Sequence, residues 1–331
     1  MADELDLLRR ADPVPPGDPR FRDRPLDHHA ERRLNRLLHG VPGAGRLGRT
    51  RRPRRRALSL AAAAAVAALA LTLLLSGPTT APAVAAPRPL VVEAGSAAVP
   101  LDRVADRAAT ADDPSRLRQG THVQTWSLAM TSGSGAPPPI TLPEERVVRW
   151  RPDGSHTELV VATDPRHPGR PVLTDGDDTP RTVADGHVLS ARSYPPSWSD
   201  APPRGRPPHD VGGLRAYLEE IDTTSTADTP GLLDATAELL DHWTLGGRES
   251  AALARVLADA GGLRPAGAVT DRLGRSGQAY VYDDTAHSVR RMLILDPATG
   301  AVLGLEDTVT EDSSEYGVKA GDVMSYSAWM R

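Results

Sequence analysis

Residues 144–162, EERVVRWRPDGSHTELVVA, contain two short β-type runs joined by a turn. Each run is rich in Val, Thr and aromatic residues, which favour strands, and Pro152-Asp153-Gly154 between them is typical of a tight turn. The stretch therefore predicts a β-hairpin, in which two neighbouring strands run antiparallel.

The same pattern recurs on both sides of this hairpin. A strand is expected at 120–130, and turn residues such as Asp296-Pro297-Ala298-Thr299-Gly300 separate further runs near the C-terminus. These C-terminal hairpins and strands are expected at 266–284, 290–309 and 322–330.

Segments of helical periodicity interrupt the strands. Apolar residues recur every three or four positions in a first segment near residue 101 and in three later ones at 210–221, 229–243 and 248–262. Pro230 at the first position of a helix capped by Thr229 fits this reading. The stretch 163–209 is rich in Pro, Asp and Gly and is expected to form a long irregular loop. Residues 99–331 are therefore predicted to be α+β, with an antiparallel sheet and helices covering one face.

An uncharged apolar run precedes this domain. Ala57 to Leu75 contains only Ser59 and Thr72 as polar residues, and nineteen helical residues span about 28 Å, close to the ~30 Å of a hydrocarbon core. The sequence predicts a single transmembrane helix at 57–76, followed by a proline-rich linker at 77–98. Cleavage after Ala83-Val84-Ala85, as in a signal peptide, is an alternative that leaves the domain unanchored.

Charge predicts the orientation of this span. Residues 1–56 carry 15 Arg against 8 acidic residues, whereas the rest of the chain has a net charge of −11. The arginines that flank the span, and that we expect to contact membrane lipid, are Arg51, Arg52, Arg54, Arg55 and Arg56. Basic short segments stay cytoplasmic, so the N-terminus is expected inside the plasma membrane and the large domain outside. Nucleic-acid binding is disfavoured because no aromatic residues interleave with these arginines.

The cytoplasmic segment 1–56 contains one amphipathic helix candidate. Asp27 can cap it, its apolar stripe is Ala30, Leu34, Leu37 and Leu38, and Gly40 ends it. Two interpretations stay open: a helix at the membrane surface or a partly disordered tail, and a segment that folds onto a cytoplasmic protein.

The chain offers few residues for chemistry. It has no cysteine, which excludes disulfides, thiolate metal sites and cysteine nucleophiles. The loop residues Asp175, Asp177 and Asp178 lack the ligand series of a calcium loop. The acidic residues Glu306, Asp307, Glu311, Asp312 and Glu315 are expected to form a soluble face. His122, His156, His187 and His242 show no partners in the sequence. No catalytic, cofactor-binding or metal site is predicted, and we expect a protein that is not an enzyme.

Several phrases carry a resemblance to a known group. They are ELDLLRRADPVPPGDPRFRDRPL at 4–26, the basic anchor, RVLADAGGLRPAGAVTDRLGRSGQAY at 255–280, LILDPATGAVLGLED at 293–307 and the aromatic C-terminus. With these phrases the chain resembles uncharacterised actinobacterial single-pass membrane proteins that are often encoded beside extracytoplasmic-function sigma factors. The resemblance implies the same topology and a role near transcriptional regulation, with a sigma factor as the partner. A zinc-type anti-sigma domain is excluded, since it needs two cysteines.

Two functions follow as hypotheses. The first is a non-enzymatic sensor or regulator that couples an extracytoplasmic binding domain to a cytoplasmic partner. The alternative is an anchored extracytoplasmic carrier or binding module for a lipid or other apolar ligand, because the order of strands and helices is similar to the half-barrel of periplasmic lipoprotein carriers.

Overall fold

The computed structural model describes residues 87–111, 116–133, 138–176, 179–196, 205–221, 226 and 228–331. The chain divides into two units, 1–71 and 72–331, and every described residue belongs to the second. The predicted cytoplasmic segment 1–56, the predicted span 57–76 and residues 77–86 of the predicted linker lie outside the described residues. Among the residues that are described, no helix has the length and apolar character needed to cross a membrane.

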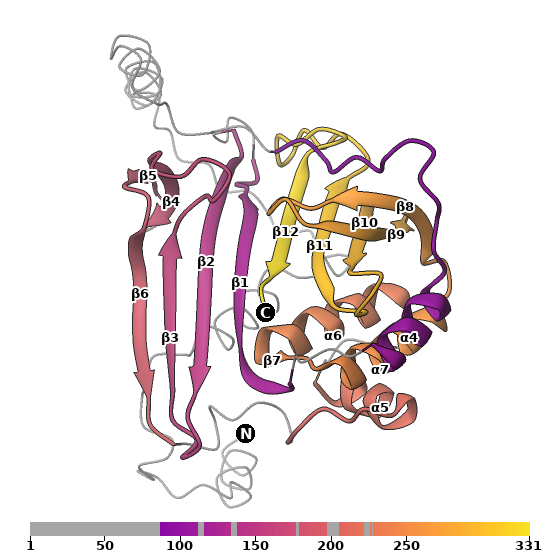
Figure 1. Cartoon of the computed structure of the whole chain (residues 1–331). Coiled ribbons are helices and arrows are strands. Elements are labelled where there is room, and N and C mark those ends of the chain that lie inside the picture. Colours follow the sequence, from indigo (N-terminus) through magenta and orange to yellow (C-terminus); the bar gives the residue numbers. More distant parts are fainter. Residues whose placement is uncertain are drawn as a thin grey trace, which may run out of the picture. The chain divides into compact units, whose positions relative to one another are not determined.

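Ten strands form one sheet, and every pairing in it is antiparallel (Figure 1). The strand order is β6-β3-β2-β1-β12-β11-β10-β9-β8, with β7 paired to β1. The strands are β1 Arg118–Ala129, β2 Ile140–Trp150, β3 His156–Ala162, β6 His187–Tyr194, β7 Trp243–Thr244, β8 Arg264–Thr270, β9 Ser276–Asp284, β10 Val289–Leu295, β11 Val302–Val309 and β12 Val323–Trp329. Within the described part the end strands β6 and β8 do not pair with each other, so the sheet is not a closed barrel.

The hairpin predicted at 144–162 is confirmed as β2 and β3. Glu144 pairs with Ala162 and Trp150 with His156, and the Arg151 N–H donates to the Ser155 carbonyl at 2.8 Å across the turn. Gly154 adopts φ 82° in this turn, a left-handed conformation that glycine reaches without the steric cost of a Cβ.

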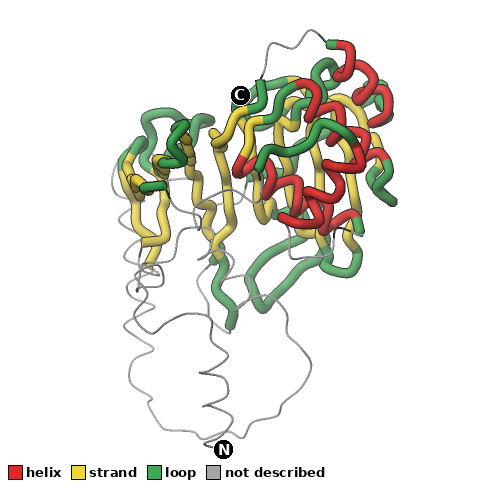
Figure 2. Tube along the Cα trace, turned by 90° about the horizontal axis from the view of Figure 1, so that it is seen from below, coloured by secondary structure: helices red, strands yellow, loops and turns green. Residues whose placement is uncertain are grey.

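Four helices pack on one face of the sheet: α4 Leu101–Thr110, α5 Val211–Ile221, α6 Thr229–His242 and α7 Gly247–Ala258. Figure 2 shows them gathered beside the strands. The periodicity of α4 predicted its inward residues, since Leu101, Val104, Ala105 and Ala108 are all buried. The α+β prediction, with an antiparallel sheet and helices on one face, is confirmed.

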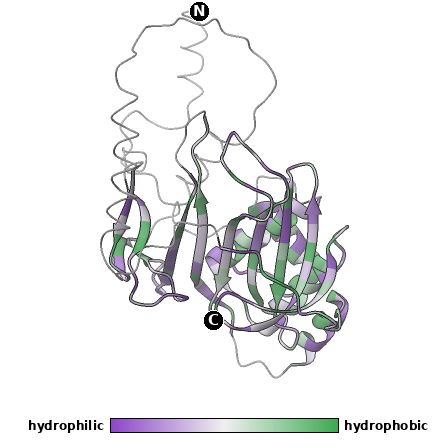
Figure 3. Ribbon diagram, turned by 90° about the horizontal axis from the view of Figure 1, so that it is seen from above, coloured by the Kyte–Doolittle hydropathy of each residue, from purple (hydrophilic) through white to green (hydrophobic). Residues whose placement is uncertain are grey.

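Alternation along the strands separates two cores. In β10, Leu293 and Leu295 pack with the helices, whereas Met292 and Ile294 pack in a second cluster on the opposite face. Figure 3 shows hydrophilic and hydrophobic residues mixed along the strands. Because period-two alternation buries both sets here, the sheet is covered on both faces in this half.

Two local predictions were wrong. The expected loop at 163–209 contains β6 and a separate two-stranded hairpin of β4 Val172–Gly176 and β5 Thr179–Val183. These strands are short or lie at the sheet edge, so they lack the long apolar runs of central strands. The cap of α6 is Asp228 rather than Thr229, because the Asp228 carboxylate accepts the Gly231 N–H at 2.9 Å.

Candidate functional site

The residues predicted to act at the membrane and in the cytoplasm lie outside the described part of the chain. They are Arg51, Arg52, Arg54, Arg55 and Arg56 beside the predicted span, and Ala30, Leu34, Leu37 and Leu38 in the predicted partner-binding helix. Asp177 and Asp178 of the candidate calcium loop are also outside it. The site described below is therefore formed by other residues.

Residues 87–99, here called the strap, run across the face of the sheet opposite the helices. Leu90 and Val92 pack against the second core cluster, next to residues such as Ile294 and Tyr326. The Glu93 N–H donates to the Ala268 carbonyl at 2.8 Å, and the Ala268 N–H donates to Ser96 Oγ at 2.9 Å. The described part of the predicted linker thus lies bonded to strand β8.

A buried ion pair fixes the start of the strap. Arg272, in the turn between β8 and β9, pairs with Glu306 of β11, and their side chains are only 5% and 1% exposed. Glu306 Oε1 also accepts the Leu90 N–H at 2.8 Å, and Arg272 donates to the Arg88 carbonyl at 3.0 Å. The pair therefore holds the strap backbone at two points, and we call Arg272 and Glu306 the anchor.

Burial sets the electrostatics of the anchor. Removal from water raises the pKa of Glu306 above its usual range, although the Arg272 charge opposes this effect. The Arg272 guanidinium also lies over the Tyr326 ring at 5.1 Å from its centre, which favours a cation in this position. Breaking such a buried pair leaves a charge without compensation, so the anchor is expected to stay closed when the domain is folded.

The strap passes close to the backbone at Gly267. This residue has φ 134°, and a Cβ on it would lie 2.5 Å from Ser96 Oγ and 2.9 Å from Val92 Cγ1. Only glycine allows this approach of strap and strand.

Only part of the acidic cluster that was expected to form a soluble face is exposed to solvent. Glu306 is buried in the anchor, and Asp307 faces the helices, where its carboxylate accepts from Arg291 Nε at 3.0 Å. Glu311, Asp312 and Glu315 are exposed. The prediction was wrong for the first two because β11 is a central strand, in which both faces are covered.

Arg291 connects the sheet to the helices. Its guanidinium donates to Asp307, to Asp234 of α6 at 2.7 Å and to the Pro230 carbonyl at 2.9 Å. Burial favours loss of its proton, but the carboxylates of Asp307 and Asp234 outweigh burial and raise the pKa of Arg291. Three partners on two elements make this arginine a fixed cross-link rather than a free catalytic cation.

A second buried cluster lies on strands β2, β3 and β6. Arg146 pairs with Glu158 at 2.6 Å and with Asp241 of α6 at 3.6 Å. His156 stacks between Trp150 and Tyr194, with ring centres 4.0 and 4.4 Å apart. These residues join the first strands of the domain to α6.

Three of the four histidines have side-chain partners that the sequence did not show, and His187 is exposed. His122 lies 2.5 Å from Glu145 and His242 lies 3.3 Å from Glu238, while His156 takes part in the aromatic stack. In the described part of the chain no three His, Asp or Glu residues gather in a way that could hold a metal ion. His122 and Glu145 lie on β1 and β2, whereas His242 and Glu238 lie on α6.

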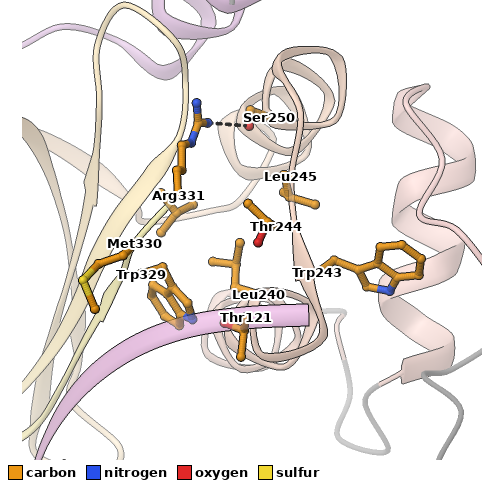
Figure 4. Close-up of a pocket in the computed structure, with 10 residues that line it drawn as sticks. Thr121, Leu240, Trp243, Thr244, Leu245, Ser250, Trp329, Met330 and Arg331 are labelled. Carbon is orange, nitrogen blue, oxygen red and sulfur yellow. Dashed lines mark hydrogen bonds between the residues drawn. The ribbon is translucent and has the colours of Figure 1, made fainter. Parts of the chain in front are cut away.

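A small hollow lies between the sheet and the helices, beside the C-terminus (Figure 4). Its lining includes Trp243, Trp329 and Leu240, and Arg331 donates to Ser250 Oγ at 3.2 Å at its edge. The volume is about 20 Å³, which holds about one water molecule. This hollow is too small for a lipid chain.

Comparisons with known proteins give no family. No family model matches the chain, and no curated protein does. Among solved structures, the dehydratase domain from the CurF module of curacin polyketide synthase aligns with 72% of this chain and 84% of its own length, at 10% identity and a TM-score of 0.10. A TM-score this low carries no argument about fold or chemistry.

Proposed function

We propose that the chain is a single-pass membrane protein of the plasma membrane, a non-enzymatic sensor or regulator whose outer domain is coupled to a cytoplasmic partner. The partner we favour is a sigma factor, on the resemblance of the sequence phrases alone. The observation that carries the proposal is the strap, because a sensor needs a firm connection between its binding domain and the membrane span.

Chain length and burial both support this coupling. Only residues 77–86 separate the predicted span from the start of the strap, and ten extended residues reach at most about 36 Å. From Pro87 onward the chain is bonded to the sheet through the anchor. In this proposal a change in the sheet at Glu306 moves the strap, and the short segment 77–86 limits how much of that movement is lost before the predicted span.

Topology is the first test. Protease added to whole cells or spheroplasts should digest the domain at 99–331 and leave a protected fragment of residues 1–76, and alkaline carbonate should not release the chain. A domain that resists protease until the membrane is lysed, or a chain released by carbonate, contradicts the proposal.

Partner binding is the second test. A photo-crosslinking residue at Leu37 of the full chain should give a crosslink to a cytoplasmic protein, and Leu34→Asp should abolish it. The matched control places the crosslinker at Arg32, which helical periodicity puts on the side of the predicted helix opposite Leu34 and Leu37. Equal crosslinking from both positions, or none from either, argues against a partner on the leucine stripe.

A carrier for an apolar ligand is the second candidate, supported by the open antiparallel sheet with helices on one face, as in a half-barrel. The packing of the helices weighs against it, since large side chains such as Leu239, Leu253 and Leu293 fill the space beneath them. Native mass spectrometry of the protein in detergent distinguishes the two, because a carrier should retain a lipid of defined mass.

A further inference from the structure

An open groove lies beside the loop that connects the end of β11 to the start of β12. Its floor is apolar, with Val309, Val318 and Met324 in one small cluster, and Met130 and Tyr316 stand beside it. The volume is about 350 Å³, at the lower end of the range for ligand pockets. We call it the methionine groove.

Two large apolar side chains that line the groove are exposed to solvent. Met130 is 38% and Tyr316 41% exposed, two of the few large apolar side chains of the described domain to reach this level. A single exposed apolar residue is ordinary, but here two converge on one hollow with an apolar floor. Methionine adapts its shape to different partners, and tyrosine is common where proteins meet.

Exposed carboxylates lie at one side of this hollow, and His287, which pairs with Asp284, also lines it. Glu311 and Asp312 line it, and Glu315 lies in the same loop. Within the described part of the chain none of the three forms an ion pair, and Lys319 is the cation in this loop. Elsewhere in the domain buried carboxylates are compensated, as Glu306 is by Arg272 and Asp307 by Arg291.

The walls of the groove are held in place before any partner binds. Asp312 Oδ1 accepts the Ala320 N–H at 2.8 Å, and Ser313 and Val318 form a β-bridge. On the other side Ser288 has φ 53°, its hydroxyl donates to Glu311 at 3.0 Å, and its carbonyl accepts the Thr310 N–H. A preformed site loses little conformational entropy on binding.

We propose that the methionine groove docks a cationic segment of a partner protein, in which an apolar side chain enters the groove and flanking Lys or Arg residues meet the three carboxylates. Charge decides among the occupants. A second copy that docked by the same surface would bring the same acidic rim, and membrane headgroups carry negative charge, so both are repelled. The basic segment 1–56 of a second copy lies on the other side of the membrane in the proposed topology. The inference deepens the proposed function and rests on it for the role of the groove as the input site of the outer domain.

The test uses the full chain in a non-ionic detergent and fluorescent peptides. The first probe has two leucines flanked by four lysines, the second replaces the leucines by serines, and the third replaces the lysines by glutamates. Anisotropy should show saturable binding of the first, binding at least about tenfold weaker of the second, and none of the third. Binding of the first should weaken as salt rises from 50 to 500 mM, since exposed charges are screened.

Variants locate the binding. Glu311→Gln/Asp312→Asn/Glu315→Gln removes three charges but leaves amide oxygens that can still accept from Ser288 and Ala320. We expect about tenfold weaker binding, which is the usual size of the effect of exposed ion pairs. Tyr316→Ser should weaken binding by a similar factor through the apolar contact. The matched control, Glu93→Gln/Asp102→Asn/Glu219→Gln, removes three exposed charges away from the groove and should change binding less than twofold.

Equal binding by the control and the groove variants, or equal binding of the leucine and serine peptides, overturns the proposal. Each variant is checked by its melting temperature, so that loss of folding is recognised, and Tyr316→Phe should retain binding. A result that contradicts the proposed topology would not change the peptide-binding results. Peptides that fail to bind would likewise not change the result of the topology experiment. The two proposals therefore fail separately.

Discussion

At the scale of single residues, the anchor shows how a buried charge is tolerated in this domain. Glu306 lies at 1% exposure and is compensated by Arg272 and by the Leu90 N–H. In the sequence Glu306 belongs to a group of acidic residues that is typical of a solvent-exposed surface, and Arg272 is 34 positions away. No spacing rule connects these residues, since the contact depends on β11 lying in the centre of the sheet.

We predict that Arg272→Met destabilises the domain by about 3–5 kcal/mol, because it leaves the Glu306 carboxylate buried without a partner. Adding Glu306→Gln should recover most of the loss, since the amide oxygen can still accept the Leu90 N–H. Urea unfolding followed by tryptophan fluorescence measures this, and all five tryptophans lie after residue 125. A double variant as unstable as Arg272→Met alone would show that the charge of Glu306 is not the cause.

A second residue-scale prediction concerns pH. Asp164 accepts from Trp126 Nε1, from the Arg166 guanidinium and from His167. Burial alone would raise the pKa of Asp164, but the hydrogen bonds from Arg166 and His167 and the charge of Arg166 outweigh burial and lower it. A lowered pKa in the folded state gives stability that is present above the ordinary value of about 3.9 and is lost as pH falls below it. Asp164→Asn should therefore cost about 1.5–3 kcal/mol at pH 7, and the cost should fall progressively as the pH is lowered below about 3.9. A cost that does not change with pH contradicts the assignment.

At the scale of elements, patterns predicted the regular pieces and missed the irregular ones. The apolar residues Leu101, Val104, Ala105 and Ala108 predicted α4, because residues that recur every three or four positions lie on the same buried face of a helix. Strand β6 was missed because both of its faces are largely exposed, so no alternation of apolar and polar residues marks it. The sequence of the strap shows neither the helical period nor the alternation of a strand. Its position depends on contacts with β8 and β11, which lie more than 170 residues away in the sequence.

Docking of the strap can be tested at Gly267. Gly267→Ala places a Cβ against Ser96 and Val92, whereas Gly274→Ala adds one at φ 79° with nothing within 4 Å. Both variants add backbone strain at positive φ, and the strain is larger at φ 134° than at φ 79°. Exchange at the strap amides, rather than total stability, therefore reports on docking of the strap. We expect Gly267→Ala alone to increase hydrogen exchange at the amides of Leu90 and Glu93, measured by mass spectrometry. Equal exchange in the two variants would mean that the strap does not depend on this close approach.

At the scale of the whole molecule, the question is where the folded domain begins. The composition of residues 77–98 predicted a linker, with the domain starting at residue 99. In the structure, residues 87–98 cover part of the second core, since Leu90 and Val92 lie on that cluster. If the strap belongs to the domain, the boundary that matters for stability lies near residue 87.

Two truncations make this a measurement. A chain of residues 87–331 should unfold in one cooperative transition, whereas 99–331 lacks Leu90, Val92 and both backbone contacts of the anchor. The shorter chain loses the burial of two partly covered aliphatic side chains and loses the Leu90 N–H as a partner for Glu306. Together these losses predict a cost of about 3–5 kcal/mol in the free energy of unfolding. The second core cluster, exposed in the shorter chain, should promote aggregation. Melting temperature and size-exclusion chromatography report both effects. Equal melting temperatures of the two truncations would mean that the strap lies on the sheet without stabilising it, and a strap held that weakly could not carry a change in the sheet to the membrane span.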